Sequence, residues 1–128
     1  MKETVLIVDD AELMRSVYTS KLLSEGYNVK TAVNGVDAIK QLSAAPPDIV
    51  LLDLVMPIVD GYKVLQAMKA DPKLARIPVI VFSGKGATDE IAKATAAGAS
   101  GFLIKATTNP NKVVEKVKEA LANRSKPG

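Results

Sequence analysis

The chain has no cysteine, histidine or tryptophan, and its only aromatic residues are two phenylalanines and three tyrosines. Without cysteine and histidine it can form no disulfide, and it has no thiol nucleophile, no imidazole base and no zinc site built on sulfur or nitrogen. The reactive groups that remain are carboxylates, hydroxyls and lysine amines. A function based on one of these groups is therefore expected.

Long hydrophobic runs are also missing. No apolar run approaches the roughly 20 residues needed to cross a bilayer, and the N-terminus lacks the apolar region of a secretion signal. We therefore expect a cytoplasmic protein with no membrane insertion. The net charge of +3 is modest, and lysine and arginine are scattered among acids without a basic block. This pattern gives no basis for direct nucleic-acid binding.

The length and apolar content suit one compact domain, since 48% of the 128 residues are hydrophobic. Five strand-like runs alternate with helix-like segments, which predicts repeated βα units and a parallel sheet. Right-handed crossovers then place helices on both faces, giving a doubly wound α/β fold. Asn28–Thr31 alternates in polarity and suits an edge strand. The five runs are Val5–Val8, Tyr27–Val33, Ile49–Leu52, Val79–Phe82 and Phe102–Ile104.

Four of the predicted helices follow a residue that can cap a helix N-terminus. A capping side chain accepts a hydrogen bond from a free backbone N–H of the first turn. Asn34 opens a sequence similar to a capping box, and Asn109 precedes a proline, which is favoured at the first helical position. The expected caps are Asp10, Asn34, Asp60 and Asn109.

The helix expected near Thr88–Ala97 differs from its neighbours. Its only large apolar residue is Ile91, and the remainder is mainly alanine, threonine and charged residues. A helix with so narrow an apolar face is held less firmly to a sheet. We expect it to be the mobile element of the fold.

Polar residues follow the predicted strands at their carboxyl ends. In open parallel sheets the ligand site lies beyond these ends, so the residues are expected to meet there. Three carboxylates together suit a hard cation such as Mg²⁺, and an aspartate can attack phosphorus to form an acyl phosphate while the metal and a lysine neutralise charge. The residues are Asp9, Asp10, Asp53, Ser83 and Lys105. The set describes a phosphate acceptor.

The ordered motifs VDD, DxxMPxxDG, FSG and FLIK at strand ends resemble the receiver domain of two-component response regulators, close to the stand-alone chemotaxis type. The resemblance covers residues 1–123 and leaves 124–128 as a polar tail. It implies a flavodoxin-like fold in which five helices surround a five-stranded parallel sheet of order 2-1-3-4-5.

The resemblance also implies roles for individual residues. Asp53 would accept a phosphoryl group from a histidine kinase. Magnesium would be held by Asp9, Asp10, Asp53 and the backbone carbonyl of Val55. Ser83 would bond the phosphoryl group, Lys105 would pair with it, and Phe102 would be the aromatic whose rotation reports the modified state.

The resemblance implies a regulatory protein that promotes only its own phosphorylation and dephosphorylation. Ser83 and Phe102 would relay the change to a protein-binding face formed by the Thr88–Ala97 helix, the Phe102–Ile104 strand and the last helix. A downstream protein would bind that face.

Two other functions remain open. A haloacid-dehalogenase-type phosphatase also uses aspartate and Mg²⁺, but its signature has a second aspartate where this chain has Val55. A receiver-like binding module that is never phosphorylated is the other, and Ala106, in place of the family's usual proline, favours it. Asp10 alone would serve as a helix cap, and Asp60 and Gly61 are interpreted as a cap and a turn residue without chemistry.

Overall fold

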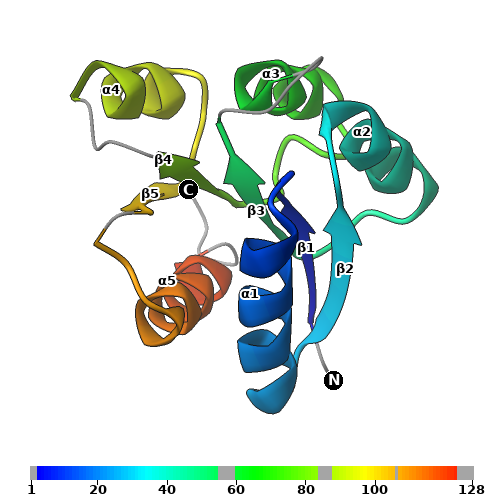
Figure 1. The fold of residues 1–128 in the computed structure, drawn as a ribbon. Coiled ribbons are helices and arrows are strands. Elements are labelled where there is room, and N and C mark those ends of the chain that lie inside the picture. Colours follow the sequence, from blue (N-terminus) through cyan, green and yellow to red (C-terminus); the bar gives the residue numbers. More distant parts are fainter. Residues whose placement is uncertain (1–2, 55–59, 84–87, 106, 124–128) are drawn as a thin grey trace.

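The computed structural model describes residues 3–54, 60–83, 88–105 and 107–123 (Figure 1). Strands and helices alternate along this part of the chain, and none of its helices has the length and apolar character needed to cross a bilayer. The elements are β1 (Thr4–Val8), α1 (Glu12–Ser24), β2 (Asn28–Ala32), α2 (Gly35–Ala44), β3 (Ile49–Asp53), α3 (Gly61–Ala70), β4 (Val79–Ser83), α4 (Thr88–Ala96), β5 (Gly101–Ile104) and α5 (Pro110–Asn123).

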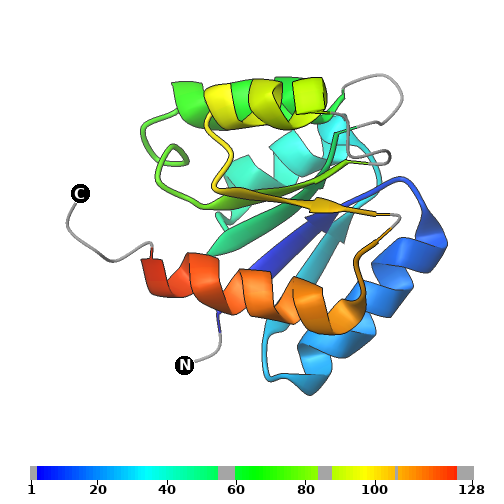
Figure 2. The ribbon, with the colours of Figure 1, turned by 90° about the vertical axis from the view of Figure 1, so that its left-hand side faces the viewer.

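The strands form one parallel sheet in the order β2-β1-β3-β4-β5, which confirms the predicted fold class (Figure 1). Helices α1 and α5 cover one face, and α2, α3 and α4 cover the other (Figure 2). Strand β2 lies at an edge, as its alternating sequence predicted, and its residues Asn28, Lys30 and Thr31 are exposed.

Strand β1 shows why the central strands are continuously apolar. Successive side chains of a strand point to opposite faces. Leu6 and Val8 belong to the hydrophobic cluster under α2, α3 and α4, whereas Val5 and Ile7 belong to the cluster under α1 and α5. All four are at most 1% exposed. Because helices cover both faces, every position of the strand must be apolar.

Three of the four predicted helix caps are confirmed. In each case the side-chain oxygen of the capping residue accepts a hydrogen bond from the backbone N–H three residues later. The bonds are Asp37 N to Asn34 Oδ1 (2.8 Å), Lys63 N to Asp60 Oδ1 (3.0 Å) and Lys112 N to Asn109 Oδ1 (3.0 Å).

The prediction that Asp10 caps α1 is wrong. The helix begins at Glu12, and its N-cap residue, Ala11, makes no side-chain capping bond. The backbone N–H of Ala11 donates instead to Asp9 Oδ1, at 2.9 Å. Asp10 lies one residue too early to cap the helix, and its side chain is exposed. Its carboxylate is therefore not committed to the helix terminus.

Helix α4 has few apolar contacts, as predicted. Among its described side chains only Ala94 is buried, and Ile91 is half-buried. Helix α5 buries four aliphatic side chains, namely Val113, Val114, Val117 and Leu121. The sparse apolar burial of α4 is thus confirmed, whereas its mobility stays a prediction.

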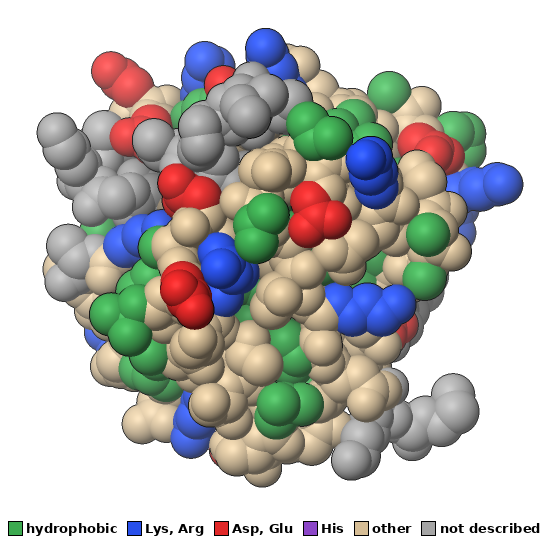
Figure 3. Space-filling view, turned by 45° about the vertical axis from the view of Figure 1, so that its right-hand side comes forward, with side chains coloured by type: hydrophobic (Ala, Val, Ile, Leu, Met, Phe, Trp, Pro, Cys, Tyr) green, Lys and Arg blue, Asp and Glu red, His purple; other side chains and the backbone are tan. Residues whose placement is uncertain are grey.

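The surface seen from the side of β2 carries charges of both signs. Among the described residues on this face, lysine and arginine are interspersed with aspartate and glutamate, and no basic patch forms there (Figure 3). A face of this kind provides no continuous positive surface for a polyanion to follow.

Candidate functional site

Three carboxylates meet at the carboxyl ends of β1 and β3. One oxygen from each of Asp9, Asp10 and Asp53 lies within 4.8 Å of the other two. Asp9 and Asp53 are 1% and 4% exposed, whereas Asp10 lies at the surface. Negative charges this close repel one another unless a cation neutralises them. The predicted grouping of these acids is therefore present, and it calls for positive charge.

Lys105, which follows β5, supplies part of that charge. Its Nζ lies 3.0 Å from Asp9 Oδ2 and 3.1 Å from Asp53 Oδ2. Burial lowers the pKa of Lys105, but hydrogen bonds and charge interactions with Asp9 and Asp53 outweigh burial, so that the pKa is raised overall. The ammonium group stays charged at neutral pH. One cation thus bridges two of the three acids, and the cluster keeps an excess of negative charge.

The position of Asp9 is fixed by hydrogen bonds to three neighbours. Its backbone N–H donates to Ala32 O at 3.1 Å, its carbonyl accepts from Arg15 Nη1 at 2.7 Å, and its Oδ1 accepts from Ala11 N at 2.9 Å. Arg15 was not among the site residues predicted from the sequence. The sequence signal that could have identified Arg15 is its position near the start of the helix that follows Asp9 and Asp10, because the start of this helix packs next to the end of β1.

Gly61 was predicted to be a turn residue without chemistry, and the turn is wrong because the residue belongs to α3, where it has a steric role beside Asp53. It is the first residue of α3, and a Cβ there would collide with the carbonyl oxygen of Asp53 and lie 2.7 Å from Leu54 Cα. Its N–H donates to Leu54 O at 3.2 Å. The missing side chain lets α3 begin directly against the backbone of Asp53.

Tyr18 lies beneath this group of residues. Its ring stacks on that of Phe82 with centroids 5.3 Å apart and an angle of 10° between the planes. Phe82 is the register partner of Asp53 in the neighbouring strand. Burial raises the pKa of Tyr18, while the charge of Lys105 lowers it and that of Asp9 raises it. Tyr18, a buried residue of α1, therefore lies in the electrostatic field of the site.

The other predicted site residues are described only in part. Ser83 ends β4 opposite Ile104, so its backbone reaches the same edge of the sheet, but its side chain lies outside the described residues. Val55 and Ala106 lie outside them altogether. Phe102 on β5 is 39% exposed, which leaves its ring accessible to solvent.

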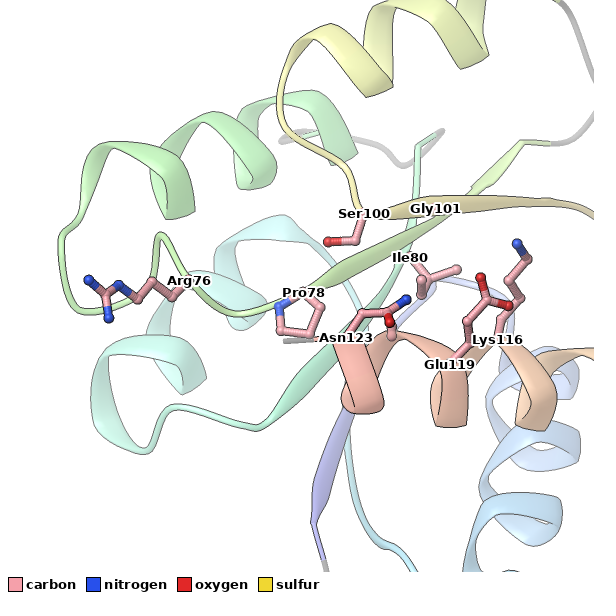
Figure 4. Close-up of a pocket in the computed structure, with 9 residues that line it drawn as sticks. Arg76, Pro78, Ile80, Ser100, Gly101, Lys116, Glu119 and Asn123 are labelled. Carbon is pink, nitrogen blue, oxygen red and sulfur yellow. The ribbon is translucent and has the colours of Figure 1, made fainter. Parts of the chain in front are cut away.

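A separate cavity of about 180 Å³ lies at the opposite ends of the strands (Figure 4). It is bounded by Pro78 before β4, by Ser100 and Gly101 at the start of β5, and by α5 as far as Asn123. The strands run from this cavity toward the acids, so it is not part of the site.

Comparison with known proteins identifies the family. The sequence profile of the response regulator receiver domain matches residues 5–118. The chain belongs to this family. Receiver domains are regulatory signalling domains that are phosphorylated by histidine kinases, and they generally bind Mg²⁺ at an acidic pocket.

The curated relatives of this chain differ in length. It is 31% identical over 121 residues to the probable transcriptional regulator ycf29 of Porphyra purpurea, covering 94% of the chain and 57% of that protein. It is 36% identical over 105 residues to the response regulator PleD of Caulobacter vibrioides, covering 82% of the chain and 23% of PleD. The chain thus spans little more than half of one of these curated relatives and under a quarter of the other.

A solved structure shows the same fold. The chemotaxis protein CheY4 of Vibrio cholerae matches with a TM-score of 0.88 at 25% identity, covering 94% of this chain and 99% of CheY4. The strand order and the surrounding helices are those expected of a receiver domain.

The acids of this receiver domain fit a magnesium ion. Mg²⁺ takes oxygen ligands and keeps several waters, so it needs a few carboxylates and access to solvent. Asp9 and Asp53 supply buried oxygens and Asp10 an exposed one, and one oxygen of each lies within 4.8 Å of the other two. The donor set contains no nitrogen or sulfur ligand, which suits a hard cation.

Proposed function

We propose that this receiver domain is a switch that accepts a phosphoryl group on Asp53 from a phosphorylated histidine kinase. The observation that carries the proposal is the position of the Asp53 carboxylate. It lies at the end of a central strand, 3.1 Å from Lys105 Nζ and within reach of two further acids. An ammonium group and a bound cation on either side of one carboxylate can stabilise the charge of a transferring phosphoryl group.

The environments of the three acids favour Asp53 as the acceptor. Both oxygens of Asp9 are engaged, Oδ1 by Ala11 N and Oδ2 by Lys105, which suits a fixed ligand. Asp10 is exposed at the rim, where a cation keeps its waters. The backbone of Asp53 is held against Gly61, so its carboxylate starts from a defined position.

The transfer forms one bond and breaks one. A carboxylate oxygen of Asp53 uses an electron pair to bond to phosphorus, the phosphorus–nitrogen bond of the donor histidine breaks, and its electron pair returns to the imidazole. Asp9, Asp10, Asp53 and the carbonyl of Val55 would hold Mg²⁺, which would supply positive charge beside the phosphoryl oxygens. Lys105 donates to a phosphoryl oxygen, and its raised pKa keeps it protonated. Attack of water on phosphorus later releases phosphate and restores the carboxylate.

The output is proposed to pass through β4 and β5. The phosphoryl group adds about −1.5 to −2 charges, and the Ser83 hydroxyl is the group at the end of β4 that can donate to it. Movement of Ser83 draws in the segment that leads to α4 and makes room for Phe102. The face formed by α4, β5 and α5 then changes shape for a downstream protein. A Ser83→Ala variant should still be phosphorylated but lose most of this response.

The chemistry is tested by intact-mass measurement after incubation with a small acyl-phosphate donor and Mg²⁺. Wild type should gain the mass of one phosphoryl group, and chelation of the metal should prevent the gain. Asp53→Asn should show no adduct. Asp60→Asn is the matched control, because asparagine caps a helix as well as aspartate does and the residue is outside the cluster.

Three results would overturn the proposal. An adduct that persists in Asp53→Asn would move the acceptor elsewhere. The absence of any adduct in wild type, also with a phosphorylated kinase as donor, would favour a receiver-like module that is never phosphorylated. Release of more than one equivalent of phosphate from added phosphate esters would favour the phosphatase alternative.

A further inference from the structure

An aromatic side chain of α3 contacts helix α4. The hydroxyl of Tyr62, the second residue of α3, donates to the backbone carbonyl of Glu90 at 3.3 Å. The Nζ of Lys93 lies 4.4 Å from the centroid of the same ring, within the range of a cation–π interaction. Glu90 and Lys93 lie on adjacent turns of α4. Tyr62 therefore contacts α4 at two points, which matters because that helix buries so little apolar surface.

The backbone next to Tyr62 is in contact with the proposed phosphoacceptor. Gly61 lies so close to Asp53 that no Cβ fits between them, and the Gly61 N–H donates to Leu54 O. No empty space separates Gly61 from the Asp53 backbone. A displacement of that backbone would therefore move the first turn of α3, together with Tyr62.

Glu90 opposes the docked position of α4. Its Oε1 is buried and has no hydrogen-bond partner among the described residues. Burial of an unpaired polar atom costs free energy that is recovered when the atom reaches water. Burial, together with the negative charges of Glu90 and Asp60, raises the pKa of Tyr62. The hydroxyl therefore remains a donor, and the Glu90 carboxylate acts on it electrostatically.

We propose that Tyr62 is a positioning residue that holds α4 on α3 against the unfavourable burial of one carboxylate oxygen of Glu90. It forms a second connection from Asp53 to α4, through Gly61, that does not involve Ser83. The holding contact exists in the unmodified protein, whereas its part in signalling rests on the proposed phosphorylation of Asp53.

The first test measures amide hydrogen exchange of α4 in the unmodified protein. Tyr62→Phe removes the hydroxyl but keeps the ring beneath Lys93, so α4 should exchange about 2- to 10-fold faster, the loss of one hydrogen bond. Tyr62→Leu also removes the ring, and exchange should be faster again. Tyr27→Phe is the matched control, because Tyr27 packs in the cluster under α1 and α5. Exchange in α5 serves as the internal reference for global stability.

The buried oxygen of Glu90 disfavours the docked position of α4, so its removal should change the rate of α4 exchange in the direction opposite to the Tyr62 variants. Glu90→Ala removes the unpaired oxygen but keeps the backbone carbonyl that accepts from Tyr62. Exchange of α4 should therefore become slower, by several-fold. Asp89→Ala is the control, since Asp89 is also an acid in the first turn but is exposed. Unchanged α4 exchange in both Tyr62 variants, or faster exchange in Glu90→Ala than in Asp89→Ala, would overturn the proposal.

The second test adds the phosphodonor and Mg²⁺. All variants should form the adduct as wild type does, because none of these side chains is in the acid cluster. The change in α4 exchange on phosphorylation should be smaller in Tyr62→Leu, whose helix is already released. A full wild-type response in that variant would overturn the signalling role. If no variant and no wild-type protein forms an adduct, the proposed function fails, while the first test still decides whether Tyr62 holds α4.

Discussion

Helices α4 and α5 lie on opposite faces of the sheet beside the edge strand β5, and different forces hold them. Helix α5 buries Val113, Val114, Val117 and Leu121, and burial of one such side chain contributes about 1.5–3 kcal/mol. Helix α4 buries Ala94 and relies on contacts with Tyr62, of which a single hydrogen bond contributes about 0.5–1.5 kcal/mol. One helix is therefore fixed by its core, and the other is held by contacts that can be exchanged.

The difference predicts that α4 can move while α5 stays in place. Release of α5 would expose much of the cluster under α1 and α5 and approach global unfolding. Among the contacts of the described residues, release of α4 gives up the burial of Ala94, one hydrogen bond and one cation–π contact, and it frees a buried carboxylate oxygen. A signal of a few kcal/mol can move the second helix without threatening the first.

The largest loss of stability is expected from a variant that disrupts the core packing of α5. Leu121→Ala should lower the free energy of unfolding by about 2–5 kcal/mol, because it leaves a cavity against the sheet. Ile91→Ala, at a half-buried position of α4, should cost about 1 kcal/mol or less. Urea unfolding of both variants measures the contrast. Equal losses would show that α4 is anchored as firmly as α5.

The second-largest effect on stability is expected at the start of α3, which lies on the same face of the sheet as α4. Gly61→Ala should cost about 1–3 kcal/mol, because the new Cβ meets the rigid backbone of Asp53 and Leu54. The displaced carboxylate should also take up less phosphoryl group. Gly101→Ala is the control, because its Cβ would meet only the end of the Ile80 side chain, at 3.1 Å. Equal stability of the two variants would contradict a close approach at Gly61.

Lys105 follows β5, the strand that lies between helices α4 and α5. Lys105→Gln removes the cation that bridges Asp9 and Asp53, so Mg²⁺ should bind about 5-fold more tightly, close to 1 kcal/mol. The rate of phosphoryl uptake should fall, because the transferring group loses a donor. Calorimetric titration with Mg²⁺ measures the affinity, and Lys112→Gln on the exposed face of α5 is the control. Weaker Mg²⁺ binding in Lys105→Gln would show that the lysine does not compete for the acids.

The smallest effect concerns the polar contacts of α5. Glu25 at the end of α1 pairs with Lys118 at 3.3 Å and with Lys21 at 3.5 Å. The hydrogen bond and the charge of Lys118, then the charge of Lys21, lower the pKa of Glu25. The stabilisation is therefore present above the ordinary value of 4.5 and is lost as pH falls through the lower folded-state pKa.

Glu25→Gln should thus lower the midpoint of thermal unfolding only slightly at neutral pH, since exposed ion pairs contribute little. The difference from wild type should vanish in strong acid and in concentrated salt. Glu115→Gln, at an exposed position of α5, is the control. A loss as large as that of Leu121→Ala would show that polar contacts, and not the core, hold α5.

Most of the fold could be predicted because local signals agreed with one another. Each central strand was a continuous apolar run, and Asn34, Asp60 and Asn109 marked three helix starts. The site followed from topology, since a parallel sheet brings Asp9 and Asp53 to the same edge whatever the loops do.

The remaining features depend on distances that no local pattern contains. The carboxylate of Asp9, not that of Asp10, reaches the start of α1, because Asp9, directly after β1, accepts from the backbone N–H of Ala11. Gly61 appeared to belong to a turn, since only the packed position of α3 shows that Asp53 occupies the space of its side chain. The contact of Tyr62 with α4 joins residues 28 positions apart in the sequence and has no periodic signal.

The stacked rings of Tyr18 and Phe82 have a spectroscopic consequence. The chain has no tryptophan, so its near-ultraviolet absorption comes chiefly from three tyrosines. Tyr18 is almost completely enclosed, and the charges of Lys105 and Asp9 act on it. A cation or a phosphoryl group arriving beside those charges alters the field across this chromophore. We therefore expect the ultraviolet absorption of Tyr18 to change when the acids are occupied, which would allow occupancy to be followed in solution without a label.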